Sequence, residues 1–259
     1  MTEDLGVNEL KANPPYIPQL GCSQSALPKG GKKVAFTLAE VLVTLGIIGV
    51  VAAMTLPMLA ENYQRIVVQT RLKKFYTTFN QAILRAIEHH GPYSGWVYEI
   101  DHYDPVAFRT TFDYYLRPYL NVIQTQDVIY TDGKSATLYY LADGSAFMYL
   151  YTHNRDIYYF PKNPVKCLQQ SAINRYGVCR FDFNFAPKSS VIGPETVQLR
   201  HVSGQGMEAY SYGWDGKPES LYYSSNNQGG CNQNGAYCTM LIKQNSWEFP
   251  KDYPRKICY

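Results

Sequence analysis

A stretch of twenty consecutive residues without an ionisable side chain, Val41 to Ala60, constrains this chain more than any other feature of its sequence. About twenty apolar residues in a helix are enough to cross the ~30 Å hydrocarbon core of a bilayer. The 259 residues contain no second stretch of this kind, which excludes a polytopic membrane protein. The mean hydropathy of −0.29 resembles that of a soluble protein because it averages over an apolar helix and a polar remainder.

Three lysines, Lys29, Lys32 and Lys33, precede the apolar stretch. Basic residues remain on the cytoplasmic side of a membrane helix, so we expect the N-terminus inside the cell and the residues after the helix outside the cytoplasm. The net charge of +3, from 24 basic and 21 acidic residues, is too small to indicate a surface for nucleic acid. We therefore expect no nucleic-acid partner.

Glu40 is a carboxylate at the start of this apolar region. On insertion scales, a charged side chain within the bilayer costs about 2.5–3.5 kcal/mol unless it finds a partner. One interpretation is that Glu40 lies close enough to the interface to stay hydrated. The other is that it pairs with a positive charge that another molecule supplies within the membrane.

Apolar residues recur at helical spacing after the apolar stretch, at Tyr63, Ile66, Val67, Leu72, Phe75, Phe79, Ile83, Ala86 and Ile87. This pattern predicts an amphipathic helix that buries one stripe against another part of the chain. Gly91-Pro92 predicts where this helix stops. A continuous helix from Phe36 to His90 would be about 80 Å long.

The rest of the chain predicts an α+β head, in which the long helix packs on an antiparallel sheet. A short helix is expected over 105–120, with Asp104 as its N-cap and Pro105 as its first residue. Strands are expected at 127–131, 134–142, 145–151, 157–160 and 178–185, with Asp-Gly turns at 132–133 and 143–144 and long loops over 186–235. The tyrosine-rich strands predict a sheet with one wet face, where rings pack and hydroxyls meet water.

The segment Ala35-Phe36-Thr37-Leu38-Ala39-Glu40 resembles the processing site of type IV pilins and of the pseudopilins of type II secretion. In that family a membrane prepilin peptidase cuts before a phenylalanine and methylates the new N-terminus. A glutamate stands four residues after that phenylalanine, which is the spacing of Phe36 and Glu40. Pro57 matches the helix-kinking proline that the family often has further along the same segment, and the resemblance covers residues 29–65.

The sequence departs from the family pattern in two respects. Ala35 stands before the expected cut, where the family usually has glycine, and the leader is long at 35 residues. Gly30-Gly31 is a poorer site, because a cut there would leave Lys32 and Lys33 on the mature chain and put Glu40 at the wrong spacing.

The resemblance implies a chain in four parts. Residues 1–35 would be a cytoplasmic leader and residues 36–60 a helix that spans the membrane and later forms the filament core. Residues 61–91 would continue that helix in amphipathic form, and residues 92–259 would form a periplasmic or extracellular head.

The resemblance also implies the site of assembly and its partners. Cleavage between Ala35 and Phe36 would create an amine on Phe36, which is N-methylated and pairs with Glu40 of a neighbouring subunit. A buried ion pair of this kind sets register, since each charge is costly alone. The implied partners are prepilin peptidase, an assembly platform, further copies of the chain and sister pilins in the inner membrane.

Six cysteines lie at positions 22, 167, 179, 231, 238 and 258. None forms a C-x-x-C pair, and in a chain with a membrane segment such spacing favours disulfides over a metal site. Cys167 with Cys179 would close a short loop, as would Cys231 with Cys238, each contributing about 2–3 kcal/mol. The alternative pairs Cys258 with Cys231 or Cys238, while Cys22 would be removed with the leader.

No catalytic motif is present in the sequence, so we expect a protein that is not an enzyme. The segment nearest to a nucleophile elbow, His201 to Gly206, lacks the first glycine. Asp182 and Asn184 are weak candidates for calcium, because some pseudopilins hold calcium in a C-terminal loop but no matching run of ligands occurs here. No other cofactor is expected.

Three functions are compatible with these patterns. The first is a structural filament subunit of a type IV pilus or of a type II secretion pseudopilus. The second is a minor pilin whose head binds a ligand or a surface. The third is a signal-anchored periplasmic enzyme, against which the missing catalytic motif and Glu40 both argue.

Overall fold

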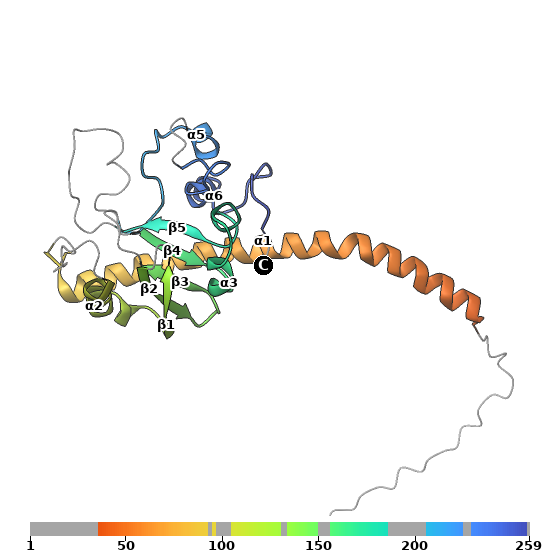
Figure 1. The fold of residues 1–259 in the computed structure, drawn as a ribbon, viewed down its shortest axis with the longest axis horizontal. Helices are drawn as coiled ribbons and strands as arrows, with labels where there is room; N and C mark the ends of the chain where they lie inside the picture. Colours follow the sequence, from red (N-terminus) through yellow and green to blue (C-terminus); the bar gives the residue numbers. More distant parts are fainter. Residues whose placement is uncertain are drawn as a thin grey trace, which may run out of the picture. The chain divides into compact units, whose positions relative to one another are not determined.

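The computed structural model describes residues 36–92, 95–96, 105–130, 134–149, 156–185, 206–224 and 229–257. Its helices are α1 (Leu38–His90), α2 (Pro105–Tyr115), the 3-10 helix η2 (Arg117–Tyr119), α3 (Pro164–Leu168), α4 (Ala172–Arg175), α5 (Pro218–Tyr222) and α6 (Cys238–Gln244). Its strands are β1 (Val122–Tyr130), β2 (Lys134–Leu141), β3 (Ala146–Tyr149), β4 (Asp156–Phe160), β5 (Phe181–Asn184) and β6 (Glu208–Ala209). The predicted α+β arrangement of a long N-terminal helix and an antiparallel sheet is confirmed (Figure 1).

The six strands follow one another across the sheet in chain order, and every neighbouring pair is antiparallel. The turn between β2 and β3 uses Asp143-Gly144, with Gly144 at a φ of +78°, where a residue with a side chain would be strained. The predicted turn at 132–133 lies outside the described residues. The predicted meander is therefore confirmed, although β1 begins five residues earlier than predicted and β6 was not predicted.

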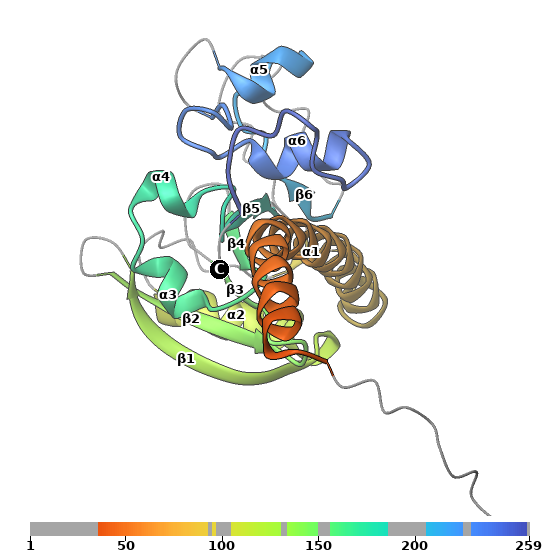
Figure 2. The same cartoon turned by 90° about the vertical axis from the view of Figure 1, so that its right-hand side faces the viewer.

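The second half of α1 covers one face of the sheet (Figures 1 and 2). The buried residues of the helix fall at intervals of three and four, at Val68, Leu72, Phe75, Phe79, Ala82, Ile83 and Ala86. Aromatic rings of the sheet meet this stripe, and the ring of Phe75 stacks on that of Tyr159 with centroids 4.2 Å apart. The predicted amphipathic stripe is confirmed from Leu72 onward, whereas Tyr63 and Ile66 remain 69% and 59% exposed.

The opposite face of the sheet is also covered, so the prediction of a wet, tyrosine-rich face is wrong for the central strands. All five residues of β4 are buried. A second core lies on this face, formed by Ala136, Leu138, Ala146, Met148, Tyr158, Phe160, Cys167 and Cys179. The Cys167–Cys179 disulfide and α3 cover side chains that the alternating pattern predicts to be exposed to solvent.

Short elements follow the sheet in a region predicted as loops. Residues 186–205 and 225–228 lie outside the described residues, but β6 and α5 fall between them. Helix α6 contacts β5 and β6, and α5 contacts α6. Elements of two to seven residues are too short to show a hydrophobic period, which is why the sequence did not indicate them.

The chain divides into two compact units, with the boundary between Val50 and Val51. The second half of α1 therefore belongs with the head. The predicted boundaries at 60 and 91 are set by the resemblance rather than by compactness, and they stay predictions.

Candidate functional site: the exposed start of the long helix

The first 23 residues of α1, from Leu38 to Ala60, contain none that is buried in the chain. Large apolar side chains on this segment stand open, with Leu38 79%, Ile48 62% and Met58 68% exposed. The segment is strongly apolar, with Glu40 as its one charged residue. At 1.5 Å per residue the segment is about 35 Å long, so this helix is long and apolar enough to cross a membrane.

Glu40 closes a capping box at the start of this helix. Its Oε2 accepts hydrogen bonds from the backbone N–H and from the hydroxyl of Thr37, both at 2.9 Å. The Thr37 hydroxyl oxygen in turn accepts the backbone N–H of Glu40 at 3.2 Å. Thr37 is thus the N-cap and Glu40 the third helical residue, an arrangement that satisfies two of the free N–H groups of the first turn.

The capping box is a role for Glu40 that the sequence analysis missed. The signal was present, because Thr-x-x-Glu before an apolar run is the pattern of such a box. The capping box bears on the interpretation in which Glu40 stays hydrated. Part of the hydrogen-bonding capacity of Glu40 is met within its own chain rather than by water. A carboxylate has about four acceptor positions, so a further donor can still bind it.

Phe36 lies just before α1 and is 80% exposed. Ala35, on the other side of the expected cut, lies outside the described residues. Phe36 therefore forms no part of the core of its own chain.

Pro57 lies inside α1, as the resemblance predicts. A proline within a helix has no N–H for the carbonyl four residues earlier, and its ring crowds that carbonyl. Gly46 and Gly49 lie on the same exposed segment, and a Cβ built on either would meet no atom within 4 Å. The packing of this chain alone therefore does not require glycine at either position.

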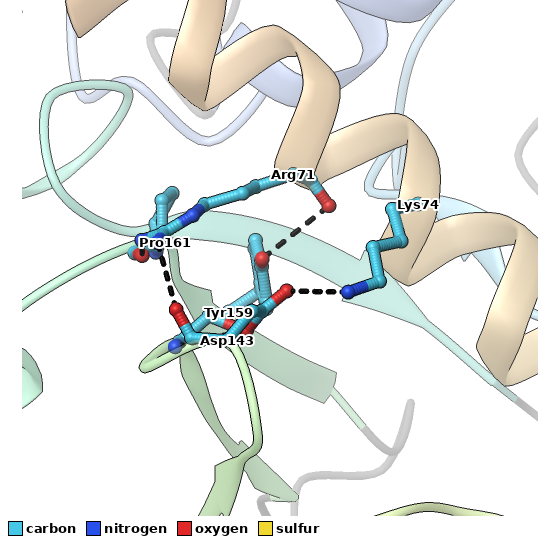
Figure 3. Close-up of polar contacts among 6 residues, drawn as sticks. Arg71, Lys74, Asp143, Tyr159 and Pro161 are labelled. Atoms are coloured by element: carbon cyan, nitrogen blue, oxygen red, sulfur yellow. Dashed lines mark hydrogen bonds and ion pairs between the residues drawn. The ribbon is translucent and has the colours of Figure 1, made fainter. Parts of the chain in front are cut away.

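A group of polar contacts fastens α1 to the sheet (Figure 3). Arg71 donates to the backbone carbonyls of Pro161 and, at 2.7 Å, of Asp143. Lys74 Nζ lies 3.0 Å from Asp143 Oδ2, and the Tyr159 hydroxyl donates to the Arg71 carbonyl at 3.3 Å. Burial opposes ionisation of Asp143, but hydrogen bonds from Ser145 and Lys74 hold its pKa below the usual value.

The C-terminal segment contacts α1 just beyond its apolar part. Arg65 donates to the Pro250 carbonyl at 3.2 Å, and its guanidinium lies 5.1 Å from the centre of the Phe249 ring. Lys256 Nζ lies 3.9 Å from Glu61 Oε2. The end of the chain is thereby held beside the residues that follow the apolar stretch.

The calcium candidates have other partners. Asp182 accepts two hydrogen bonds from Arg180, at 2.7 and 2.8 Å, and both side chains are almost wholly buried. Asn184 donates to Asp156 at 2.6 Å, while its Oδ1 is buried without a hydrogen-bond partner. Within the described ranges no group of three or more His, Cys, Asp and Glu side chains is placed to hold a metal. The arrangement favours an internal ion pair over a cation site.

The ion pair between Arg180 and Asp182 was not predicted from the sequence. Two residues apart on a strand, the side chains point to the same face, and the sequence Arg-x-Asp was the available signal. The rings of Tyr158 and Tyr176 complete the surroundings, with centres 3.2 and 4.0 Å from the Arg180 guanidinium carbon.

The structure contains both of the short-loop disulfides that spacing suggested. Cys167 is bonded to Cys179, and Cys231 to Cys238. These bonds exclude the alternative in which Cys258 pairs with Cys231 or Cys238 in this structure. Cys22 and Cys258 themselves lie outside the described residues.

Comparison with known protein families gives a match for most of the chain. A family model described as a family of unknown function, DUF6613, matches residues 58–257. No curated protein and no solved structure matches the chain. The family match covers the second half of α1 and the head but begins after Phe36, Glu40 and Pro57. Because it covers 200 of the 259 residues, this chain belongs to the DUF6613 family of unknown function.

Proposed function

We propose that this protein is a structural filament subunit of the type IV pilin and pseudopilin class. It is inserted in the inner membrane with residues 1–35 in the cytoplasm, and prepilin peptidase cleaves it between Ala35 and Phe36 and methylates Phe36. With an assembly platform, the mature chain then joins other copies and sister pilins through the first half of α1. The head remains periplasmic or at the cell surface.

The observation that supports this proposal most strongly is the unburied apolar surface of α1 directly after the Phe36–Glu40 motif. Each 100 Å² of apolar surface left in water costs about 2.5 kcal/mol relative to burial. A helix with this surface needs a bilayer or neighbouring helices around it. A filament subunit needs both in turn, first the membrane and then the filament core.

Two further features support helix-to-helix assembly. The open positions at Gly46 and Gly49 permit close approach of a second helix, as small residues do in membrane interfaces. The charge of Glu40 would fix the axial position of one helix against the next. A neighbour's Phe36 ammonium and the Glu40 carboxylate are each costly when buried alone, so the helices would align where the two groups meet.

The capping box provides a matched pair of variants to test the proposal. Glu40→Gln removes the charge but retains a side chain that completes a capping box. Thr37→Val removes the cap hydroxyl but retains the charge. We expect Glu40→Gln to enter the membrane normally and to be lost from filaments at least tenfold, because a neighbour's buried ammonium would have no counter-charge. Thr37→Val should assemble nearly as well as the parent chain.

The measurement is an immunoblot of the chain in the membrane fraction and in the sheared filament fraction of cells that have the assembly machinery. Normal incorporation of Glu40→Gln would refute the pairing of Glu40 with a neighbour. Equal loss in both variants would show that assembly is sensitive to any change in the first turn of the helix, and would leave no support for a role of the Glu40 charge between subunits.

A further inference from the structure

A basic pocket of about 660 Å³ lies in the head beside the Cys167–Cys179 disulfide. Four of its lining residues are cationic, namely Lys162, Lys166, Arg255 and Lys256, and none of its lining residues is Asp or Glu. Lys162 and Lys166 are exposed. The pocket therefore presents positive charge with no carboxylate in its lining, and the nearby Glu61 lies beside Lys256 alone among its cations.

The backbone around the pocket is held on several sides. The disulfide ties α3 to the segment before β5. Arg71 of α1 donates to the carbonyl of Pro161, which precedes Lys162. Arg255 donates to the carbonyls of Cys231 and Gln233 at 2.8 and 2.9 Å. The cationic side chains thus stand on fixed backbone, while the exposed side chains of Lys162 and Lys166 can reach a ligand.

At Lys256, one edge of the pocket reaches the point where the apolar part of α1 ends. Lys256 lines it, and Lys256 Nζ is 3.9 Å from Glu61. Glu61 is the first charged residue after the apolar stretch. A bilayer that covers residues up to Ala60 would have its phosphate groups at the level of Glu61 and Lys256, because the headgroup layer directly follows the hydrocarbon core.

We propose that this pocket binds the phosphate group of an anionic lipid while the subunit is in the membrane. The inference rests on the membrane insertion in the proposed function, but not on filament assembly. Basic residues just outside a membrane helix attract anionic headgroups, and Lys162 and Lys166 supply ammonium groups for one phosphate. The continuity of the pocket with the end of the apolar helix favours a lipid over a soluble phosphate.

The test uses the full chain in vesicles of phosphatidylcholine, with and without added phosphatidylglycerol. Native mass spectrometry of the chain released from these vesicles measures the lipids that stay bound. The test variant is Lys162→Gln/Lys166→Gln. The matched control is Arg85→Gln/Lys217→Gln, which removes the same charge from exposed positions that do not line the pocket.

The parent chain and the control variant are expected to retain phosphatidylglycerol over phosphatidylcholine. The pocket variant should lose this preference by about 25-fold, since each of the two basic residues near an anionic surface strengthens binding roughly fivefold. Raised salt should reduce the preference of the parent chain in the same way.

Three results would overturn the proposal. The pocket variant could retain the full preference for phosphatidylglycerol. The control variant could lose the preference equally, which would show that the effect depends only on net charge. Inorganic phosphate at millimolar concentration could remove the bound lipid, which would assign the pocket to soluble phosphates. A chain that fails to enter either kind of vesicle would instead contradict the membrane insertion in the proposed function, so the two failures are distinguishable.

Discussion

Asp143 connects the turn of the β2–β3 hairpin to the long helix. Its Oδ1 accepts the backbone N–H and the hydroxyl of Ser145, at 3.1 and 2.5 Å, while Oδ2 binds Lys74. Its lowered pKa means that the folded chain binds a proton on this group less readily than the unfolded chain. The stability from this carboxylate is therefore present above the unfolded pKa and is lost as the pH falls through the folded value.

Asp143→Asn should make the head less stable by about 1 kcal/mol at neutral pH, because the ion pair with the exposed Lys74 is of modest strength. The deficit should shrink as the pH falls below about 4, where the aspartate of the unfolded parent chain takes up a proton, and should vanish only below the lowered pKa of the folded chain. Urea unfolding of the full chain in detergent micelles, followed by tryptophan fluorescence at several pH values, measures the difference. A deficit that stays constant from pH 7 to pH 3 would show that the charge of Asp143 is not its cause.

Single residues could be predicted where the signal is local. Asp143-Gly144 was expected as a turn, because Asp-Gly between alternating strands is a hairpin signal. Lys74 was not expected as its partner, since the two residues are 69 positions apart and only the packing of α1 on the sheet brings them together. Thr37 was missed although its signal was local, because the resemblance supplied another explanation for Glu40.

Helix α1 has an exposed apolar first half and a second half that packs on the head. Hydrophobic period predicted its buried stripe, but not the residue at which the stripe begins, because Tyr63 and Ile66 fit the same period and remain exposed. Where burial begins depends on how far the head extends along the helix. In the structure the first fully buried residue is Val68.

Phe75→Ala tests whether this stripe holds the head on the helix. The Phe75 ring contacts those of Tyr159, Phe147 and Phe183, and truncation of such a ring should cost about 3–5 kcal/mol. Leu84→Ala is the control on the same helix, since Leu84 is 66% exposed and its loss should change stability by less than about 0.5 kcal/mol. Urea unfolding in micelles compares the two, and equal effects would refute the packing of this face.

The strands show what alternation can and cannot predict. Alternating residues and Asp-Gly turns located β2 and β3 within two residues. The same alternation assigned one face to solvent, which was wrong because α3 and the Cys167–Cys179 disulfide cover it. Helix α3 has five residues, which is too few to show a hydrophobic period in the sequence, so its cover of this face could not be predicted.

At the scale of the whole molecule, family membership and the processing motif rest on different parts of the chain. The family match begins at residue 58, after the motif at residues 35–40 and after Pro57. The head and the second half of α1 therefore identify the family, and the first half of α1 supports the function. Family membership and the processing motif are independent of each other, so the proposed function depends on the N-terminal segment alone.

The most direct test of that proposal is the N-terminus of the mature chain. The protein is purified from membranes of cells with an active prepilin peptidase, and its N-terminal peptide is sequenced by mass spectrometry. We expect a chain that begins at Phe36 with a methylated amine, while cells without the peptidase retain the chain with residues 1–35. An intact N-terminus at Met1 in both kinds of cell, or a cut after residue 53, would contradict it.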